Sequence, residues 1–303
     1  MKDIVEKDAV AIRALLKQVL FVDGYTDIKR LGGLTNHTYH IVLNDGRQYV
    51  ARIPGEGTEN MIDRSNEMVS TSLACRLGVD ARLLYFGSDG VKVTEYIPDA
   101  ITMSAQILCD KKYIHQVADI LKIIHRCGEN TNVPFEVFDM ALEYEKIILD
   151  MSVPMFDDYS ECKATVMNIK KEIDEQINAP KVPCHNDPLC ENWVLGEGRM
   201  YLIDWEYAGM NDGMWDVADV SIEANFDEQS DLRLLEEYLE RVPTNLDMKH
   251  FLANKIYVDF LWTLWAKARV PYDGKPMDDW AIERYARMKA NIKKFNHVKE
   301  NVL

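Results

Sequence analysis

Apolar and polar positions follow a strand-like pattern in the first hundred residues of this chain. Two β-like runs, IKRLGGLTNHTYHIVL and RQYVARIPG, are joined by the turn Asn44-Asp45-Gly46-Arg47. An Asp-Gly pair between such runs is typical of a β-hairpin. A second strand pair is predicted around Ser88-Asp89-Gly90. This region is therefore expected to be rich in short antiparallel strands.

Helical periodicity precedes this region, interrupts it and then dominates the rest of the chain. Apolar positions between Ile4 and Leu20 fit one helical face, and residues 59–77 predict a helix that ends at Gly78. Pro98 and Asp99 break the pattern, after which the period becomes helical. Further helices are predicted at 103–127, 139–151, 159–178, 215–225, 228–241, 247–269 and 278–298, with β-like segments and a Gly196-Glu197-Gly198 turn in 182–208. The pattern indicates an α+β fold with a small β-rich lobe (1–97), a hinge and a larger helical lobe (98–303).

Composition narrows the class of partner. Of the 303 residues 47% are apolar and 28% charged, which is ordinary for a globular protein, and the formal net charge is −15. A net negative charge disfavours nucleic acid and anionic membranes, and it suits a cationic substrate. The first thirteen residues carry charges, and no run of about 18 apolar residues occurs. We therefore expect a cytoplasmic protein without membrane insertion. Its oligomeric state is left open.

Six cysteines without a CxxC spacing predict free thiols in a reducing compartment, Cys184 and Cys190 among them.

The stretch HNDPLCENWVLGEGRMYLIDWEYAG (185–209) carries the candidate chemistry. Asn192 follows Asp187 by five residues, and Asp204 comes twelve residues later, after a β-run and its turn. This is the pattern of phosphoryl transfer in kinases, where an Asp accepts the proton of the acceptor hydroxyl and an Asn and a second Asp bind Mg²⁺. Hard oxygen ligands hold Mg²⁺ while leaving coordination positions for phosphate oxygens.

Two alternatives stand beside this interpretation. The stretch is a polar loop if Asp187 only caps a turn and Asp204 only ends a strand. It is a hydrolase metal site if His185 and Asp187 are ligands, but the other histidines show no pairing at ligand spacing. The combined spacing and hairpin favour the kinase interpretation, with His185 shaping the catalytic loop.

The residues HNDPLCENWVL and LIDWEYAGMNDGMWDVAD closely resemble the choline/ethanolamine kinases, and the LicA-type bacterial choline kinases in particular. Weaker matches extend the resemblance over nearly the whole chain. It implies the bilobed protein-kinase-like fold of the aminoglycoside phosphotransferases, with a nucleotide-binding lobe (1–97) and a catalytic, substrate-binding lobe (98–303). It also implies ATP- and Mg²⁺-dependent phosphorylation of choline to phosphocholine.

Carried over by position, the resemblance makes Asp187 the catalytic base. The metal ligands implied are Asn192, Asp204 and Glu206. The ATP site implied consists of Gly32, Gly33 and Asn36 over the triphosphate, Arg52 on the phosphates with Glu67 as its ion-pair partner, and the hinge from Glu95 to Ile97 beside the adenine. Without the resemblance, Arg52 is equally a surface residue on an edge strand.

The acceptor site is expected on the later helices. Trp262 and Trp265 lie three residues apart and share one helix face, which by itself is also typical of core tryptophans. The resemblance implies a cage for a quaternary ammonium, since aromatic faces attract cations that cannot donate strong hydrogen bonds. The implied choline-binding residues are Tyr207, Asp219, Glu223, Trp262, Trp265 and Trp280, with Asp216 bracing the loop.

The matches leave the acceptor open at two positions. Family members often carry Asn or Ala where this chain has Asp219, and Tyr where it has Trp280. The alternatives are therefore an ethanolamine or aminoglycoside kinase on the same fold, or a catalytically silent choline-binding module. The intact Asp187 argues against the silent module.

Overall fold

The computed structural model describes residues 6–31, 36–55 and 62–300, and the chain divides into two compact units. The first unit comprises residues 1–103 and 191–208, and the second comprises residues 104–190 and 209–303. These units differ from the lobes drawn from the sequence chiefly in the segment 191–208, which groups with the first unit. The assignment of a nucleotide lobe and a substrate lobe stays a prediction.

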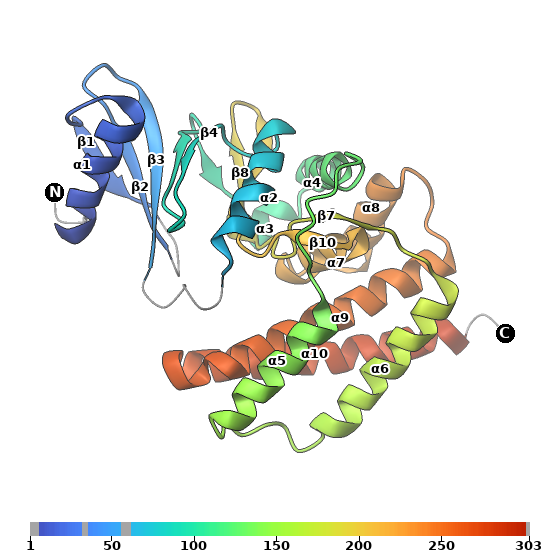
Figure 1. Cartoon of the computed structure of the whole chain (residues 1–303). Coiled ribbons are helices and arrows are strands. Elements are labelled where there is room, and N and C mark those ends of the chain that lie inside the picture. The colour runs from blue at the N-terminus through green and yellow to red at the C-terminus, as the bar shows by residue number, and fades with distance from the viewer. Residues whose placement is uncertain (1–5, 32–35, 56–61, 301–303) are drawn as a thin grey trace. The chain divides into compact units, whose positions relative to one another are not determined.

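A five-stranded antiparallel sheet forms the centre of the first unit, and helix α1 packs on it (Figure 1). Ile12, Leu15 and Leu16 of α1 are buried against Tyr39 and Ile41 of the sheet. Both predicted hairpins are present, and the glycines in their turns have the positive φ angles that such turns require. In spatial order the strands are β1 (Asp27–Arg30), β2 (Asn36–Val42), β3 (Gln48–Pro54), β5 (Lys92–Glu95) and β4 (Leu83–Phe86), and α1 spans Glu6–Leu20.

Helix α2 (Arg64–Arg76) and a small three-stranded sheet complete the first unit. The Asp63 side chain accepts hydrogen bonds from two backbone N–H groups at the start of α2, so the helix begins there. The predicted helix began at residue 59, and residues 59–61 lie outside the described residues. The small sheet has the order β6 (Ile101–Thr102), β8 (Trp193–Gly196) and β9 (Arg199–Leu202).

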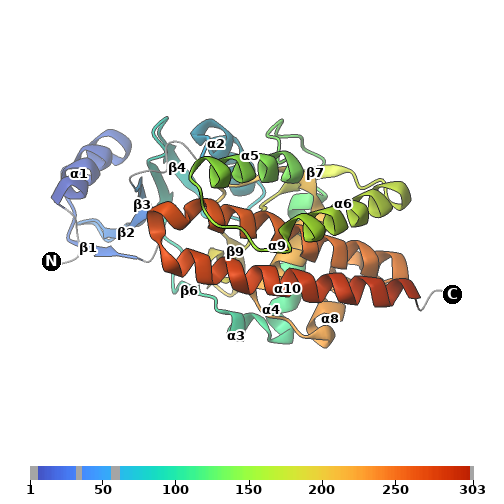
Figure 2. The ribbon, with the colours of Figure 1, turned by 90° about the horizontal axis from the view of Figure 1, so that it is seen from below.

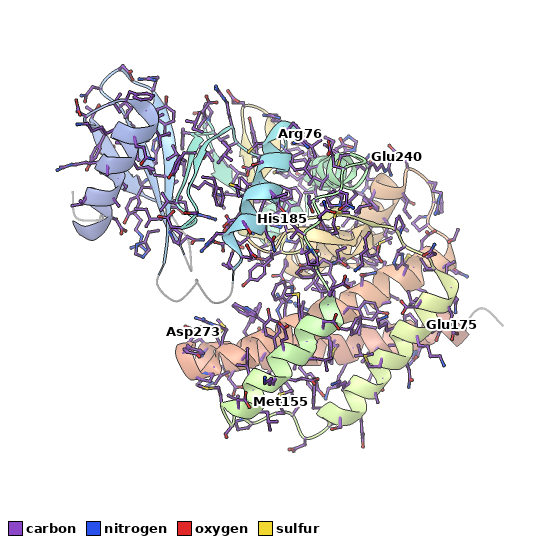
Figure 3. All side chains as sticks on the ribbon, viewed as in Figure 1. Arg76, Met155, Glu175, His185, Glu240 and Asp273 are labelled. Atoms are coloured by element: carbon purple, nitrogen blue, oxygen red, sulfur yellow. The ribbon has the colours of Figure 1, made fainter. Side chains whose placement is uncertain are left out.

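The second unit is mainly helical, and α9 is its most buried helix. Helix α10 runs beside α9, and α5 and α6 also pack against α9 (Figure 2). Met155 lies in the connection between α5 and α6 (Figure 3). The elements are α3 (Ala105–Leu108), α4 (Lys111–His125), α5 (Val137–Asp150), α6 (Tyr159–Gln176), β7 (Lys181–Cys184), β10 (Gly209–Asp212), α7 (Gly213–Glu223), α8 (Glu228–Leu239), α9 (Asn245–Asp273) and α10 (Lys275–Glu300).

The helix boundaries differ from prediction at two places. The helix predicted at 103–127 is two helices, because Ser104 caps α3 and Asp110 caps α4. Helix α9 continues past residue 269, through Pro271, and ends at Gly274, whose φ is +71°. Within the described residues no helix is both long and apolar enough to cross a membrane.

Candidate active site

The hairpin β8–β9 brings two predicted metal ligands together in the first unit. Trp193 pairs with Leu202, so the residues just outside the pair, Asn192 and Ile203, are neighbours. The N–H of Ile203 donates to the carbonyl oxygen of Asn192 at 2.9 Å. Asp204 follows directly, with a left-handed φ of +70°. The twelve-residue spacing between Asn192 and Asp204 is therefore the length of a closed hairpin.

Arg52 lies on the inner strand β3 and is 4% exposed. Its Nη2 is 2.5 Å from Oε1 of Glu67 on α2, so the predicted ion pair is present. Its Nη1 is 3.0 Å from Oδ1 of Asp204. The alternative of a surface arginine on an edge strand is wrong, because β3 lies between β2 and β5. Burial makes such an ion pair depend on both of its members.

Glu206 joins this cluster through two further donors. Arg64 donates to its Oε1 at 2.6 Å, and the side-chain amide of Asn36 donates to the same atom at 3.0 Å. Burial raises the pKa of Glu206, and the charge of Asp204 raises it further. Arg64 was missed from the sequence, although its spacing of three residues from Glu67 on one helix was a signal, and the two are 2.7 Å apart.

This cluster has the donor set for a divalent cation. Oxygen atoms of Glu67, Asp204 and Glu206 lie within 4.8 Å of one another. Carboxylates are the hard ligands that Mg²⁺ prefers, and the Asp204 side chain is 35% exposed whereas Glu67 is fully buried. The residues therefore fit a metal held mainly by Asp204, with Asn192 beside it.

The remaining predicted ATP residues lie near the end of β5, except Gly32 and Gly33, which are outside the described residues. Glu95 ends β5, and its carboxylate is 3.0 Å from Arg82. Ile97 packs closely on Gly196 of β8: a Cβ added at Gly196 would lie 2.2 Å from Ile97 Cγ2. The backbone of the predicted hinge thus depends on a glycine that the sequence analysis treated only as a turn residue.

In the second unit, the loop after β7 carries Asp187. His185 directly follows β7 (Figure 3). The Asp216 carboxylate on α7 accepts from the N–H of His185 at 2.7 Å and from the N–H of Asn186 at 2.8 Å. The N–H of Asp187 in turn donates to Nδ1 of His185 at 3.3 Å. Asp216 braces the loop, as predicted, and His185 shapes it from inside.

A second layer of polar contacts supports Asp216 and Asn186. His125 on α4 places Nε2 3.0 Å from the Asp216 carboxylate and Nδ1 2.9 Å from the hydroxyl of Tyr238. The side-chain amide of Asn211 donates to Asn186 at 2.9 Å. Asn186 has a φ of +66°, which an Asn tolerates better than most residues. His125 was missed because it lies 91 residues from Asp216 in the chain.

Cys184 lies beside this loop, and its thiol donates to the carbonyl oxygen of Asn211. Burial raises the pKa of Cys184 well above its ordinary value, so the group is a protonated thiol and a poor metal ligand. All six cysteines are free, as predicted.

Three tryptophans from α9 and α10, here named the tryptophan cluster, lie together: Trp262, Trp265 and Trp280. The ring centroids of Trp262 and Trp265 are 6.1 Å apart at 87°, and those of Trp265 and Trp280 are 5.9 Å apart at 78°. Successive rings are therefore nearly perpendicular. Such an arrangement presents aromatic faces in different directions, as the binding of a quaternary ammonium requires.

Asp219 and Glu223 of α7 lie near this cluster but differ in their contacts. Asp219 is fully buried, so the alternative of a solvated helix face is wrong for it. Burial raises the pKa of Asp219 well above its ordinary value, and the charges of Glu223 and Asp187 act in the same direction. The catalytic aspartate is thus close enough to be felt at Asp219. Tyr207 belongs to the first unit, and its part in a cage stays a prediction.

The buried Arg52–Glu67 pair, the hairpin carrying Asn192 and Asp204, and the braced Asp187 loop define a kinase-type phosphotransferase. The sequence model of the choline/ethanolamine kinase family matches residues 28–271. A structure of a choline/ethanolamine kinase family protein from Mesorhizobium loti is 30% identical, with a TM-score of 0.85, and the match covers 96% of this chain and 97% of that protein.

The structure of choline kinase LicA from Streptococcus pneumoniae is 28% identical, with a TM-score of 0.81, and the match covers 95% of this chain and all of that protein. The protein LicA of Haemophilus influenzae is 29% identical over 263 residues, which are 84% of this chain and 76% of that protein. The chain belongs to the choline/ethanolamine kinase family and is thus an enzyme. The implied protein-kinase-like fold is confirmed.

Proposed function

We propose that the protein transfers the γ-phosphoryl group of ATP to the hydroxyl group of choline, giving phosphocholine and ADP. The observation that carries this proposal is the tryptophan cluster beside the buried Asp219, whose carboxylate oxygens have no hydrogen-bond partner among the described residues. A buried carboxylate without a donor is unfavourable unless a cation approaches it. Aromatic faces beside such a carboxylate suit a methylated ammonium group.

The chain's own residues divide the reaction between them. Asp187 orients the acceptor hydroxyl and accepts its proton, while Asp216 holds the loop that carries it. Arg52, kept in place by Glu67, binds the phosphates of ATP. Asn192, Asp204 and Glu206 are the proposed ligands for Mg²⁺, which when bound neutralises charge on the phosphate oxygens.

Ethanolamine is the second candidate acceptor. A primary ammonium donates hydrogen bonds, and the partnerless oxygens of Asp219 would accept them. Three indoles offer less to such a group than to a trimethylammonium, because a primary ammonium is more strongly hydrated. The tryptophans therefore favour choline, and Asp219 keeps ethanolamine in the comparison.

The test is release of ADP by the purified protein with Mg-ATP and, in parallel, choline, ethanolamine, kanamycin or no acceptor. We expect choline to give the largest stimulation. Preference for ethanolamine would keep the phosphotransferase chemistry and overturn the role given to the tryptophans. Binding of choline without any ADP release would replace the enzyme by a choline-binding module.

A further inference from the structure

Arg284 of α10 is a buried cation placed among the acids near the tryptophan cluster. It is 2% exposed, and its guanidinium carbon lies 4.0 Å from the ring centroid of Trp280. Its Nη2 donates to Oε1 of Glu223 on α7, and its Nη1 lies 3.2 Å from Oδ1 of Asp259 on α9. Arg284 thus shares one positive charge between two carboxylates and covers an aromatic face.

Asp259 has a second partner. Arg287 of α10 donates to Oδ1 of Asp259 at 2.6 Å and to Oδ2 at 2.9 Å. This fork-like contact is the geometry in which a guanidinium binds a carboxylate most strongly. Glu223 and Asp259 are therefore both compensated by groups of the protein itself.

Asp219 contrasts with both of these acids. It lies one helical turn before Glu223 on α7 and is fully buried. Neither of its carboxylate oxygens has a hydrogen-bond partner among the residues that the structure describes. Arg284 is close enough to act on it electrostatically, yet forms its hydrogen bonds with Glu223 and Asp259. A cation entering this region meets one acid without a partner.

We propose that Arg284 is a specificity-determining residue that masks Glu223 and Asp259, so that Asp219 alone serves as counter-ion to the substrate's monocationic head group. This inference rests on the proposed function, which it deepens. Arg284 acts through the acids and through Trp280. Its influence on the substrate is one of positioning and charge, not of direct chemistry.

The charges of this arrangement predict unequal effects of removing its members. A paired glutamate and arginine produce a weak field a few ångströms away, whereas an unpaired carboxylate acts with its full charge. Removing both members of a buried pair is tolerated far better than removing one. Removing Arg284 alone unmasks Glu223 and should strengthen the attraction for a cation.

The experiment measures Kd by isothermal titration calorimetry for choline and for its neutral isostere, in which a tert-butyl group replaces the trimethylammonium group. The ratio of the two Kd values isolates the preference for positive charge from shape. The variants are Asp219→Asn, Arg284→Met, and the double variant Glu223→Gln with Arg284→Met. Methionine keeps an apolar contact with the Trp280 ring.

We expect Asp219→Asn to reduce the charge preference on the order of a hundredfold. The double variant should keep the preference within about threefold of the unaltered protein, and Arg284→Met alone should raise it. A double variant that loses the preference as fully as Asp219→Asn would overturn the inference, because Glu223 would then be the counter-ion. This comparison stands even where Arg284→Met alone does not fold.

The unaltered protein separates failure of the inference from failure of the proposed function. If it binds choline no better than the neutral isostere and releases no ADP with choline, the proposed function fails. If it prefers choline and phosphorylates it, the variants decide the role of Arg284 alone.

Discussion

The Asp216 carboxylate holds the backbone of the loop at His185, with an O···N distance of 2.7 Å, two residues before Asp187. The same carboxylate also accepts from the N–H of Asn186 and faces Nε2 of His125. A carboxylate can accept all of these hydrogen bonds at once, whereas a carboxamide has one acceptor oxygen. The position of the proposed base therefore depends on the charge of a residue that does not touch the substrate.

Asp216→Asn should lower kcat on the order of a hundredfold, because a misplacement of about 1 Å at a reacting group has an effect of this size. The free energy of unfolding should fall by about 1–3 kcal/mol. Steady-state kinetics and thermal unfolding measure both. Asp231→Asn is the matched control, since Asp231 is also buried but contacts Ser221 and Lys255 instead of the loop. Equal kcat values in Asp216→Asn and Asp231→Asn would contradict the bracing role.

Asp187→Ala should remove turnover and leave folding intact. A positioned acid–base group contributes roughly 10²–10⁴-fold to a rate, and the loop backbone is held by Asp216, not by the Asp187 side chain. The measurement is kcat with choline, together with the unfolding midpoint. Full activity in the variant would remove Asp187 from its proposed role.

The parts predicted best from the sequence depend on short spacings. The hairpins at Asp45-Gly46 and Asp89-Gly90 need glycines with positive φ, and both glycines have them. The interval between Asn192 and Asp204 is the length of one hairpin, so the sequence itself brings the two together. Local geometry of this kind is encoded within about twenty residues and can be recognised without a structure.

The parts that were missed depend on contacts between distant segments. Arg284 lies 61 residues from Glu223, and no periodicity connects the two. His125 was an unpaired histidine in the sequence until the fold placed it beside Asp216. The predicted helix 103–127 was interrupted because both Ser104 and Asp110 act as caps, a local signal that helical periodicity concealed.

Trp265→Ala should raise KM for choline by roughly three- to thirtyfold, since a cation–π contact contributes about 0.5–2 kcal/mol. KM for ATP should stay unchanged, because Trp265 lies in the unit that holds α9 and α10. Trp265→Phe is the matched variant: it keeps an aromatic face and should have a smaller effect. An unaltered KM for choline in Trp265→Ala would exclude the tryptophan cluster from choline binding.

Gly196→Ala should weaken ATP binding. The added Cβ would lie 2.2 Å from Ile97 Cγ2 and 2.9 Å from the carbonyl oxygen of Pro98, so the predicted hinge must move. Such overpacking typically lowers the free energy of unfolding by about 1–3 kcal/mol. Gly24→Ala is the control, because a Cβ there meets no atom within 4 Å. A stability loss without any rise in KM for ATP would show that this backbone does not contact the nucleotide.

Asp80 should make stability depend on pH in a direction opposite to that of most acids. Burial raises the pKa of Asp80 to about 6, against the nearby positive charge of Lys92, which lowers it. The unfolded value is about 3.9, so between pH 4 and 6 the folded state binds more protons than the unfolded state. The contribution of Asp80 to the free energy of unfolding therefore falls as the pH rises through this window, by about 3 kcal/mol.

Asp80→Asn tests this by removing the titration while keeping an acceptor for the N–H of Ala81, which lies 2.6 Å from Asp80 Oδ1. Denaturant unfolding of both proteins between pH 4 and 7 gives the difference in unfolding free energy, in which the titrations of the other acids largely cancel. The variant should gain stability relative to the unaltered protein as the pH rises, because the unaltered protein must keep a buried charge. A difference that stays constant from pH 4 to 7 would mean that the Asp80 carboxyl keeps its ordinary pKa in the folded protein.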